Sequence, residues 1–597
     1  MTTPAQRLAA LRAAMKQHQL DAWIIPSADP HLSEYLPEHW QTRSWVSGFT
    51  GSVGTLAVTE NEATLWADSR YWEQAEKQLA GSGIRLEKLG FGRTHIDWLA
   101  ETLPENAVVG IAPDMLSAAG LKQLQAAFAA KNITLRLEDD IVNGFWSDRP
   151  ALPDAPVFIH EAVYTEESAA EKLARVRQFM RDKGADHHLV SSLDDIAWIT
   201  NLRGGDVDYN PVFLSHLLID AERAVLFIDS AKLGAAEQAW LQEAGIATAP
   251  YADAADVVSA LSGCLMYDSG KVAVSVVGRL PESVRLIDHI NPSTLFKSVK
   301  SDKEVEYIRQ AMIQDGAALC GFFAEFERRI AAGDKLTELD VSDMLIEHRS
   351  RREAYVSPSF GTIAGYRENG ALPHYSATPE AFSPLDGSGL LLIDSGAQYK
   401  TGTTDITRVV SVGEPTAEQK RDFTLVLKAH IALACAVFPE DIKAPMLDAI
   451  CRAPLWQAQC DYGHGTGHGV GYFLNVHEGP QLIAYQASVL SPHHAMKAGM
   501  ITSNEPGLYR PGKWGIRIES LVVSRPVAQP AETEFGRFLY FETVTMCPID
   551  TRLVDKSLLN DAETAWLNQY HATVRAKLEP LTEGEAKTWL IERTQAI

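Results

Sequence analysis

The stretch DYGHGTGHGVGYFLNVHEGP, residues 461–480, decides how the C-terminal half of this chain is interpreted. His464, His468 and His477 lie in it among closely spaced glycines. Glycine lacks a Cβ atom, so the backbone of such a stretch can approach a ligand closely. Gly-His stretches also occur in plain loops, and this one gains meaning only together with three neighbouring segments.

Two of these segments lie upstream, and each carries one aspartate. GLLLIDSGAQY, residues 389–399, has the apolar run of a buried strand and ends near Asp394. TGTTDITRVVSV, residues 401–412, indicates a second strand with Asp405 near its start. Only a short polar stretch separates the two, so a hairpin would place the aspartates side by side.

The last segment is SNEPGLYRPGKWGIRIESLVV, residues 503–523. Glu505 is expected to follow a turn and Glu519 to lie on a strand. The alternation of that strand directs Arg517 and Glu519 to one face and the two isoleucines beside them to the other.

Each of these acidic residues taken alone is weak evidence, because an aspartate at a strand end is usually a turn former. As a set they pose a physical problem, since clustered buried carboxylates repel one another and raise their own pKa values. Two divalent cations solve it by offsetting four negative charges, and they supply hydroxide near neutral pH. Four carboxylates with one histidine form an oxygen-rich set, which favours Mn²⁺, although Zn²⁺ or Co²⁺ can also bind.

The bulk composition excludes several other classes of protein. The 597 residues carry 54 Lys+Arg and 77 Asp+Glu, a net charge of -23, which argues against nucleic acid and anionic membranes as partners. Six cysteines without a CxxC pair argue against a disulfide framework or a cysteine-rich zinc site. No apolar run is long enough for a transmembrane helix, and no signal-peptide pattern is recognised, so a cytoplasmic location is expected.

The N-terminal half contains an internal repeat. RLAALRAAMKQHQLDAWIIPS (residues 7–27) aligns without a gap on KLARVRQFMRDKGADHHLVSS (residues 172–192), and each copy indicates an amphipathic helix followed by a strand. Further on, TLWADS at residues 64–69 matches VLFIDS at residues 225–230. Order and spacing persist over a domain-sized offset, which indicates duplicated α/β domains.

Two boundaries divide the chain. Three prolines in DRPALPDAP, residues 148–156, indicate a stiff linker, and Ser301 with Glu304 forms a capping box that opens a long helix. Long helices are predicted over 301–332, 336–352 and 415–438, and a further helix over 560–578. The predicted domains are 1–150, 157–298 and 299–597, the first two α/β and the third α+β.

The sequence resembles the pita-bread metallopeptidases, the family that contains methionine aminopeptidase, prolidase and aminopeptidase P. The order Asp-Asp-His-Glu-Glu and the segments DSG, TTDITR, GHGTGHGVG, NEPG and RIES carry the resemblance. YVSPSF (355–360) and ENGALPHY (368–375) are similar to segments that shape the peptide site of aminopeptidase P. The two upstream domains and the C-terminal extension resemble its long, three-domain cytosolic form, so the resemblance covers almost the whole chain.

The resemblance implies a fold and a role for each residue. The fold is two related N-terminal creatinase-like α/β domains followed by a C-terminal pita-bread catalytic domain. The implied metal ligands are Asp394, Asp405, His468, Glu505 and Glu519, with Asp405 and Glu519 bridging both ions. A bridging hydroxide attacks the scissile carbonyl, and Glu505 assists proton transfer. The other implied catalytic residues bind substrate, stabilise the tetrahedral intermediate or orient the ligands, and they are His374, His464, His477 and Arg517.

The implied activity is an aminopeptidase that hydrolyses the N-terminal Xaa-Pro bond of peptides. Its close alternative is a prolidase that accepts only Xaa-Pro dipeptides, and prolidases of this fold are typically shorter. A non-catalytic peptide-binding module on the same fold is a weaker alternative, since such members usually lack the metal ligands. Members of the long form are commonly dimers, so a homodimer is expected.

Overall fold

The computed structural model describes residues 3–90 and 92–597, so Met1, Thr2 and Phe91 of the predicted first domain lie outside the described residues. The chain forms two compact units, Met1–Ser293 and Thr294–Ile597. Helix α11 (Pro292–Ser298) spans the boundary between them. In the described part of the chain, no helix is both long and apolar enough to cross a bilayer.

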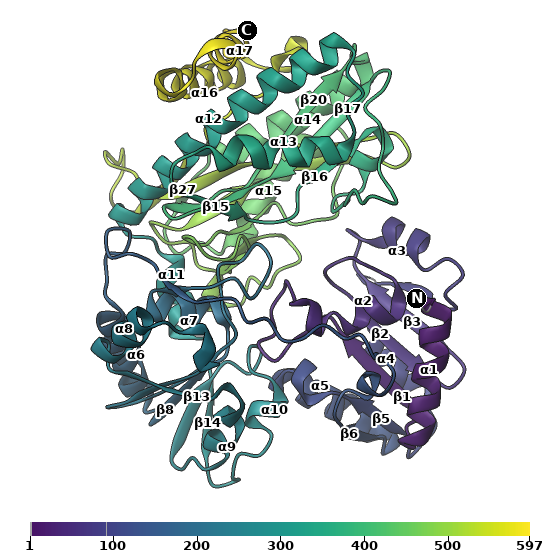
Figure 1. Cartoon of the computed structure of the whole chain (residues 1–597). Helices are drawn as coiled ribbons and strands as arrows, with labels where there is room; N and C mark the ends of the chain where they lie inside the picture. Colours follow the sequence, from purple (N-terminus) through teal and green to yellow (C-terminus); the bar gives the residue numbers. More distant parts are fainter. Residues whose placement is uncertain (1–2, 91) are drawn as a thin grey trace. The chain divides into compact units, whose positions relative to one another are not determined.

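The N-terminal unit contains two six-stranded mixed sheets, both drawn in Figure 1. The first has the strand order β4-β3-β2-β1-β5-β6. Its strands are β1 (Ala22–Pro26), β2 (Thr55–Thr59), β3 (Ala63–Ala67), β4 (Arg85–Lys88), β5 (Val108–Ile111) and β6 (Thr134–Leu137). Its helices are α1 (Pro4–Gln17), α2 (Thr42–Ser47), α3 (Trp72–Gln78), α4 (His95–Thr102) and α5 (Ala118–Phe128).

The second sheet repeats the first, with the order β12-β11-β10-β8-β13-β14. Its strands are β8 (His187–Val190), β10 (His216–Asp220), β11 (Ala224–Phe227), β12 (Ile246–Ala249), β13 (Cys264–Tyr267) and β14 (Arg285–Asp288). Its helices are α6 (Ala169–Lys183), α7 (Leu193–Thr200), α8 (Ala235–Glu243), α9 (Ala254–Ser259) and α10 (Val274–Val277). A separate two-stranded sheet is formed by β7 (Phe158–Ile159) and β9 (Leu202–Arg203).

Strand order and direction confirm the predicted duplication. The central strands β1 and β8 each pair antiparallel on one side, with β2 and β10, and parallel on the other, with β5 and β13. The aligned sequence copies fall on α1–β1 and α6–β8, and the shorter matches fall on β3 and β11. The proline-rich segment 149–156 between the copies contains neither helix nor strand.

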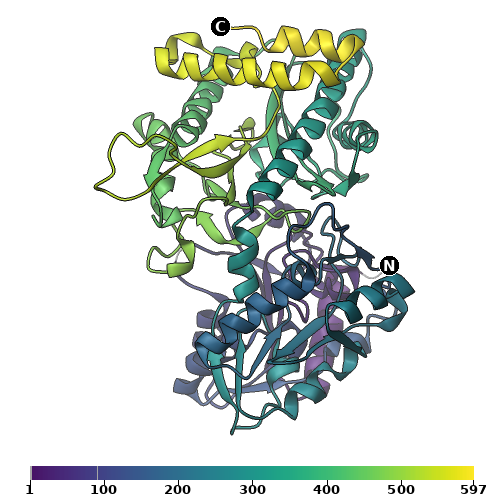
Figure 2. The ribbon, with the colours of Figure 1, turned by 90° about the vertical axis from the view of Figure 1, so that its left-hand side faces the viewer.

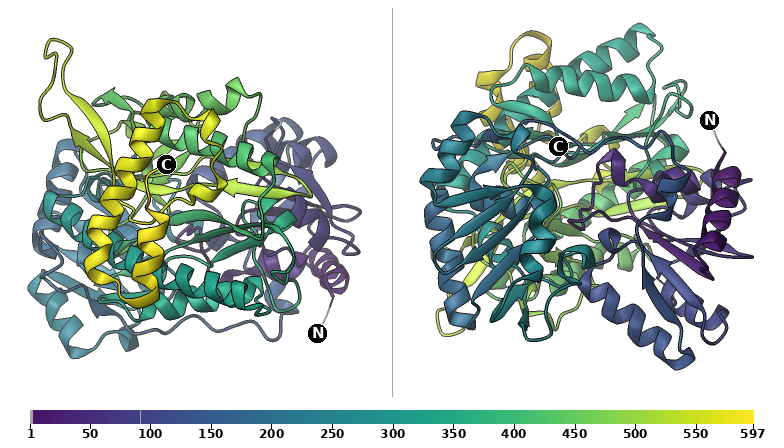
Figure 3. Two further views of the ribbon diagram at one scale, coloured as in Figure 1. Left: turned by 90° about the horizontal axis from the view of Figure 1, so that it is seen from above. Right: turned by 60° about the horizontal axis from the view of Figure 1, so that its bottom comes forward.

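The C-terminal unit packs long helices around several small sheets. Helix α12 (Asp302–Ala332) begins at the predicted capping box of Ser301 and Glu304. It is the long teal helix in the upper half of Figure 2. The other helices are α13 (Glu338–Ser350), α14 (Ala417–Ala434), α15 (Asp448–Gln457), α16 (Asp561–Leu578) and α17 (Gly584–Arg593). Helices α16 and α17 lie side by side against α12 (Figure 3), and α17 was not foreseen from the sequence.

Four sheets complete this unit, with orders β15-β18-β19, β16-β17-β20, β21-β28-β27-β24-β22-β23 and β25-β26. The strands of its first half are β15 (Tyr355–Pro358), β16 (Ile363–Tyr366), β17 (Gly389–Ser395), β18 (Ala397–Tyr399), β19 (Gly402–Thr403) and β20 (Ile406–Val412). Those of its second half are β21 (Val437–Pro439), β22 (Gly467–Gly469), β23 (Glu478–Ile483), β24 (Ile501–Asn504), β25 (Gly507–Arg510), β26 (Trp514–Arg517), β27 (Ser520–Pro526) and β28 (Phe538–Thr543). One large apolar core joins the helices to β17, β20, β27 and β28.

Candidate metal centre

The two aspartates are brought together by the hairpin that the sequence predicts. Strands β17 and β20 pair antiparallel with Asp394 opposite Thr407, and the β18–β19 hairpin connects them, followed by Asp405. Gly396 permits this closure, because a Cβ atom there would lie 2.0 Å from the carbonyl oxygen of Thr404. The glycine directly after Ser395 is therefore a packing requirement of the site.

His468 lies in the middle of the short strand β22. A Cβ atom at Gly467 would lie 2.0 Å from the Ser503 carbonyl oxygen, and one at Gly469 would lie 2.2 Å from that of Glu478. These two glycines thus let neighbouring strands come close to β22. The backbone amide of His468 also donates to the Ser503 hydroxyl at 2.9 Å.

The two glutamates lie beside the ends of two neighbouring strands, β24 and β27, of the sheet that contains β22. Glu505 follows β24 directly, so the expectation that it follows a turn is wrong. Glu519 lies in the two-residue link between β26 and β27 rather than within a strand. The reason is that the chain changes sheets here: β26 pairs with β25, whereas β27 pairs with β24 and β28.

Glu519 is nevertheless fixed by the strand that follows Asp405. Its backbone amide donates to the Thr407 carbonyl at 3.1 Å, and its carboxylate accepts the Thr407 hydroxyl at 2.7 Å. Candidate ligand atoms of Asp405, His468 and Glu519 all lie within 4.8 Å of one another. His468 Nε2 is 3.5 Å from an oxygen of Asp405 and 3.5 Å from one of Glu505.

Arg517 connects Asp394 to this cluster. Its Nη2 atom lies 2.6 Å from Asp394 Oδ2, and its Nε donates to the Thr407 hydroxyl at 3.1 Å. The expected proximity of Arg517 to the acidic residues is therefore found. The second carboxylate oxygen of Asp394, Oδ1, is buried and has no hydrogen-bond partner in the described part of the chain. An orphaned buried oxygen of this kind fits a site built to bind a cation.

The electrostatics of the cluster are those of a cation site. Burial and the neighbouring Asp405 raise the pKa of Asp394 to about 6, although Arg517 opposes the shift. Burial and the charges of Asp405 and Asp394 also raise the pKa of Glu519 well above its ordinary value. Burial disfavours charge on His468, yet the hydrogen bond with Asp405 and the charge of Glu505 raise its pKa to about 9. The carboxylates need further positive charge, which divalent ions would supply.

The orientation of the His468 ring also suits a ligand. Nδ1 lies 2.9 Å from the Gly469 carbonyl oxygen, which can only accept a hydrogen bond. Nδ1 therefore carries a proton, and Nε2, which faces Asp405 and Glu505, is the nitrogen left to bind a metal ion. One imidazole nitrogen with four carboxylates is an oxygen-rich donor set that fits divalent first-row metals.

Two of the other predicted histidines are joined to this cluster, His477 by ring packing and His464 by hydrogen bonds. His477 packs edge-on against His468, with ring centroids 4.4 Å apart. His464 Nε2 lies 2.7 Å from the Tyr509 hydroxyl, which in turn accepts a hydrogen bond from Arg517 Nη1 at 2.6 Å. A series of hydrogen bonds thus runs from Arg517 through the Tyr509 hydroxyl to His464.

His374 is placed less directly. It lies half-buried in the turn after the short helix Arg367–Ala371, and it follows Pro373, whose carbonyl accepts a hydrogen bond from Arg517 Nη2 at 3.3 Å. The structure therefore places the turn that carries His374 beside Arg517.

Three residues of the site were missed by sequence reasoning: Thr407, Ser503 and Tyr509. Thr407 supports Glu519 and Arg517, and Ser503 donates to Glu505 at 3.1 Å. All three fall within or beside quoted segments, but hydroxyl residues carry no spacing signal that marks them as functional.

Comparison with known proteins matches most of the chain to described families. Residues 306–526 match the model of metallopeptidase family M24, and residues 537–597 match the C-terminal region of that peptidase family. Residues 7–138 and 148–304 match models of the creatinase/prolidase N-terminal domain.

Full-length relatives agree with these matches. The chain is 39% identical to aminopeptidase P2 of Arabidopsis thaliana over 97% of this chain and 86% of that protein. It is 36% identical to Xaa-Pro aminopeptidase 1 of Dictyostelium discoideum, covering 97% and 94% of the two chains. A crystal structure of X-prolyl aminopeptidase from Caenorhabditis elegans, described as a cytosolic enzyme with a di-nuclear active site, superposes with a TM-score of 0.95 at 31% identity and covers 100% of both chains.

Proposed function

Because the chain belongs to the Xaa-Pro aminopeptidases (aminopeptidase P) of metallopeptidase family M24, we propose that it removes the N-terminal residue from peptides whose second residue is proline. The observation that carries this proposal is the convergence of Asp405, His468 and Glu519, with Asp394 and Glu505 beside them, in a chain that matches such enzymes over its full length.

Five side chains would hold two metal ions, most favourably Mn²⁺. Asp405 and Glu519 would bridge the ions, Asp394 would bind one of them, and His468 and Glu505 would complete the other. When bound, the ions offset the four carboxylate charges, polarise the scissile carbonyl and supply a hydroxide nucleophile near neutral pH. The preference for Mn²⁺ over Zn²⁺ or Co²⁺ rests on the excess of oxygen ligands.

The remaining side chains would handle the substrate and its protons. Glu505, which lies 3.5 Å from His468 Nε2 and accepts a hydrogen bond from Ser503, would assist proton transfer. His374, His464 and His477 would bind the substrate backbone, stabilise the tetrahedral intermediate or give a proton to the leaving proline nitrogen. Arg517 would orient Asp394 and, through Tyr509, hold His464.

Proline in the second position explains why a specialised site is needed. A bond before proline has no N–H, and the ring fixes φ, so peptidases that use that N–H cannot bind it productively. The decisive experiment compares the tripeptide Arg-Pro-Pro with the dipeptide Arg-Pro, using Arg-Ala-Ala as the control. We expect release of arginine from Arg-Pro-Pro and not from Arg-Ala-Ala. Cleavage of Arg-Pro alone would establish the prolidase alternative instead.

Dependence on metal is tested separately. Exhaustive chelation should abolish hydrolysis of Arg-Pro-Pro, and added Mn²⁺ should restore it together with about two bound ions per chain. Full activity in the chelated protein would contradict the two-metal mechanism, and binding of peptide without cleavage would favour a non-catalytic module.

A homodimer and a cytoplasmic location complete the proposal. Support for a dimer comes from apolar side chains on neighbouring elements of the catalytic unit, namely Met446, Trp456 on α15 and Leu482 on β23, each exposed to solvent. Leu490, 89% exposed, lies further along the chain. Analytical ultracentrifugation should give a dimer, and Trp456→Glu should shift it toward monomer. The cytoplasmic location rests on the Caenorhabditis elegans relative, which is described as cytosolic.

A further inference from the structure

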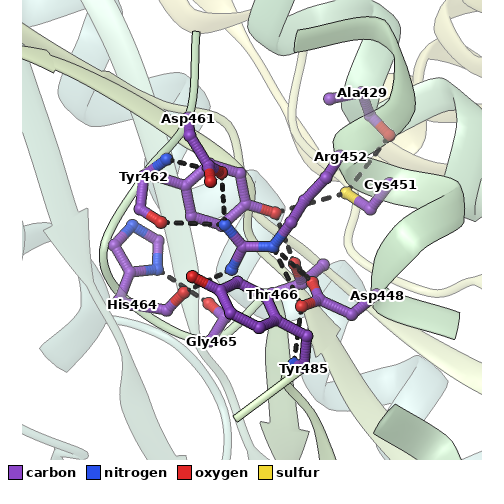
Figure 4. Close-up of polar contacts among 10 residues, drawn as sticks. All are labelled: Ala429, Asp448, Cys451, Arg452, Asp461, Tyr462, His464, Gly465, Thr466 and Tyr485. Atoms are coloured by element: carbon purple, nitrogen blue, oxygen red, sulfur yellow. Dashed lines mark hydrogen bonds and ion pairs between the residues drawn. The ribbon is translucent and has the colours of Figure 1, made fainter. Parts of the chain in front are cut away.

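Arg452 is a fully buried arginine. In the described part of the chain, it forms no hydrogen bond with any of the five candidate metal ligands. It lies on α15, and its guanidinium lies over the ring of Tyr462, 3.8 Å from the centroid, and over that of Tyr485 at 4.6 Å (Figure 4). Burying a guanidinium is costly unless its N–H groups find acceptors. The hydrogen-bond acceptors of Arg452 therefore identify the part of the chain that it holds in place.

Most of these acceptors belong to one stretch, residues 461–466, named here the His464 segment. Nη1 donates to the Asp461 carboxylate at 2.6 Å and to the Tyr462 carbonyl at 2.8 Å, and Nη2 donates to the His464 carbonyl at 2.7 Å (Figure 4). The segment contains neither helix nor strand, so its carbonyl groups lack regular backbone partners. Arg452 supplies the missing donors.

Asp448, one turn earlier on α15, closes the network. Its carboxylate accepts Arg452 Nε at 2.9 Å, the backbone amide of Tyr485 at 2.7 Å and the hydroxyl of Thr466. The Arg452–Asp448 pair thus binds the His464 segment at both of its ends and joins it to the chain that follows β23.

The His464 segment leads from this pair to the metal centre in two ways. The His464 side chain reaches Tyr509 and, through it, Arg517 and Asp394. The Thr466 carbonyl accepts the backbone amide of Glu505 at 2.9 Å. Within the segment, Arg452 itself bonds only Asp461 and the Tyr462 and His464 carbonyl groups, so its loss would displace His464 first. Thr466, which bonds Glu505, is held separately by Asp448.

We propose that Arg452 is a positioning residue, which holds the backbone of the His464 segment so that the His464 imidazole stays on the Tyr509 hydroxyl at the metal centre. This inference rests on the proposed function for its kinetic consequences. Lysine cannot replace the planar fork of arginine, because one ammonium group cannot reach Asp448, Asp461 and two carbonyl groups at once.

The test is a double-mutant cycle on the full-length protein loaded with Mn²⁺. Arg452→Lys should lower kcat/KM for Arg-Pro-Pro by about 10- to 100-fold, the range typical of residues that support a metal site, while retaining two bound ions. In a His464→Gln background the same substitution should change kcat/KM less than threefold, because the residue through which Arg452 acts is already lost. Equal losses in both backgrounds, or loss of metal in Arg452→Lys, would overturn the proposal.

A second measurement does not depend on activity. Diethyl pyrocarbonate should modify His464 about tenfold faster in Arg452→Lys than in the unsubstituted protein, because the loosened segment opens more often. Mass spectrometry follows the modification, and the exposed His18 should react at the same rate in both proteins. An unchanged rate at His464 overturns the inference even if no Xaa-Pro peptide is cleaved. Failure of the unsubstituted protein to cleave Arg-Pro-Pro would refute the proposed function alone.

Two further variants guard against misfolding. Asp461→Ala removes one acceptor of the guanidinium at an exposed position, and it should give a smaller loss of kcat/KM that also disappears in the His464→Gln background. Arg43→Lys is the matched control, since Arg43 is also buried and donates to backbone carbonyls, those of Phe49 and Gly51, but in the N-terminal unit. In Arg43→Lys, diethyl pyrocarbonate should modify His464 at the same rate as in the unsubstituted protein.

Discussion

Glu338 and Glu519 are both buried glutamates of the C-terminal unit, with exposed fractions of 0% and 1%, yet their surroundings are opposite. Glu338, the first residue of α13, accepts hydrogen bonds from the backbone amides of Tyr366 and Ser383, both at 2.7 Å. It also accepts the Tyr375 hydroxyl at 2.8 Å and the Asn369 amide at 3.0 Å.

Glu519 instead accepts the Thr407 hydroxyl and faces other carboxylates, which together with burial raise its pKa. Burial alone therefore does not identify a functional glutamate. A buried carboxylate surrounded by donors is a structural cross-link, whereas one that faces other carboxylates is incomplete without cations.

The largest expected effect separates the two glutamates directly. Glu519→Gln should reduce bound metal below two ions per chain and lower kcat by more than about 100-fold, beyond the range for residues that only support ligands. Asp405→Asn should behave in the same way, because both carboxylates are assigned as bridges. Metal content by plasma mass spectrometry checks this, and two tightly held ions in either variant would refute the bridging roles.

Glu338→Gln should give the converse result, with metal retained and stability lost. The new amide group faces donors that have lost an acceptor, and broken hydrogen bonds to a buried charge cost about 3 kcal/mol. Thermal unfolding of the metal-loaded protein measures the loss. Glu347→Gln, an exposed substitution on the same helix, is the control and should leave the melting temperature unchanged. A metal-deficient Glu338→Gln protein would end the distinction drawn between the glutamates.

Much of the fold and part of the candidate site could be expected from the sequence. The order of two creatinase-like domains and a pita-bread domain is confirmed. It could be predicted because the motifs and the repeat are local patterns in the chain. The pairing of Asp394 with the strand after Asp405 was also predictable, since a short connection between two strands forces a hairpin.

The rest depends on contacts between distant segments. The position of Glu519 between two strands is set by which sheet each strand joins, and the alternating pattern of side chains does not encode that choice. The donors to Glu338 come from up to 45 residues away, and Arg452 reaches its carbonyl acceptors only because the His464 segment folds back on α15. Such partners have no spacing rule.

A smaller effect is expected from the single hydroxyl that supports Glu519. Thr407→Val keeps the shape of the side chain but removes the hydrogen bond to Glu519 and the acceptor for Arg517 Nε. Loss of such a supporting contact should weaken metal affinity about tenfold without abolishing turnover at saturating Mn²⁺. Competition with a fluorescent chelator measures the affinity. Thr424→Val, also buried but bonded to the Lys420 carbonyl on α14, should leave it unchanged.

The smallest effect concerns pH and tests whether the carboxylate cluster lacks positive charge. In the metal-free protein, His468 has a pKa of about 9 against 6.5 for the ordinary side chain. Between these values the folded protein holds a proton that the unfolded chain has released, so stability present below pH 6.5 is lost as the pH rises through 9. The raised pKa of Asp394, about 6, acts in the same direction at lower pH.

Between pH 7 and 9 the melting temperature of the metal-free protein should therefore fall, by about 2 °C or more for a chain of this size. Metal-free His468→Asn is the control, because it lacks the titrating ring and should show a shallower fall over the same interval. Bound Mn²⁺ should also flatten the slope, since a ligand imidazole carries no proton on Nε2 and the carboxylates then face cations. A metal-free protein whose stability is unchanged or greater at pH 9 would mean that the carboxylates are already compensated, as Glu338 is, and that the two glutamates differ less than their surroundings indicate.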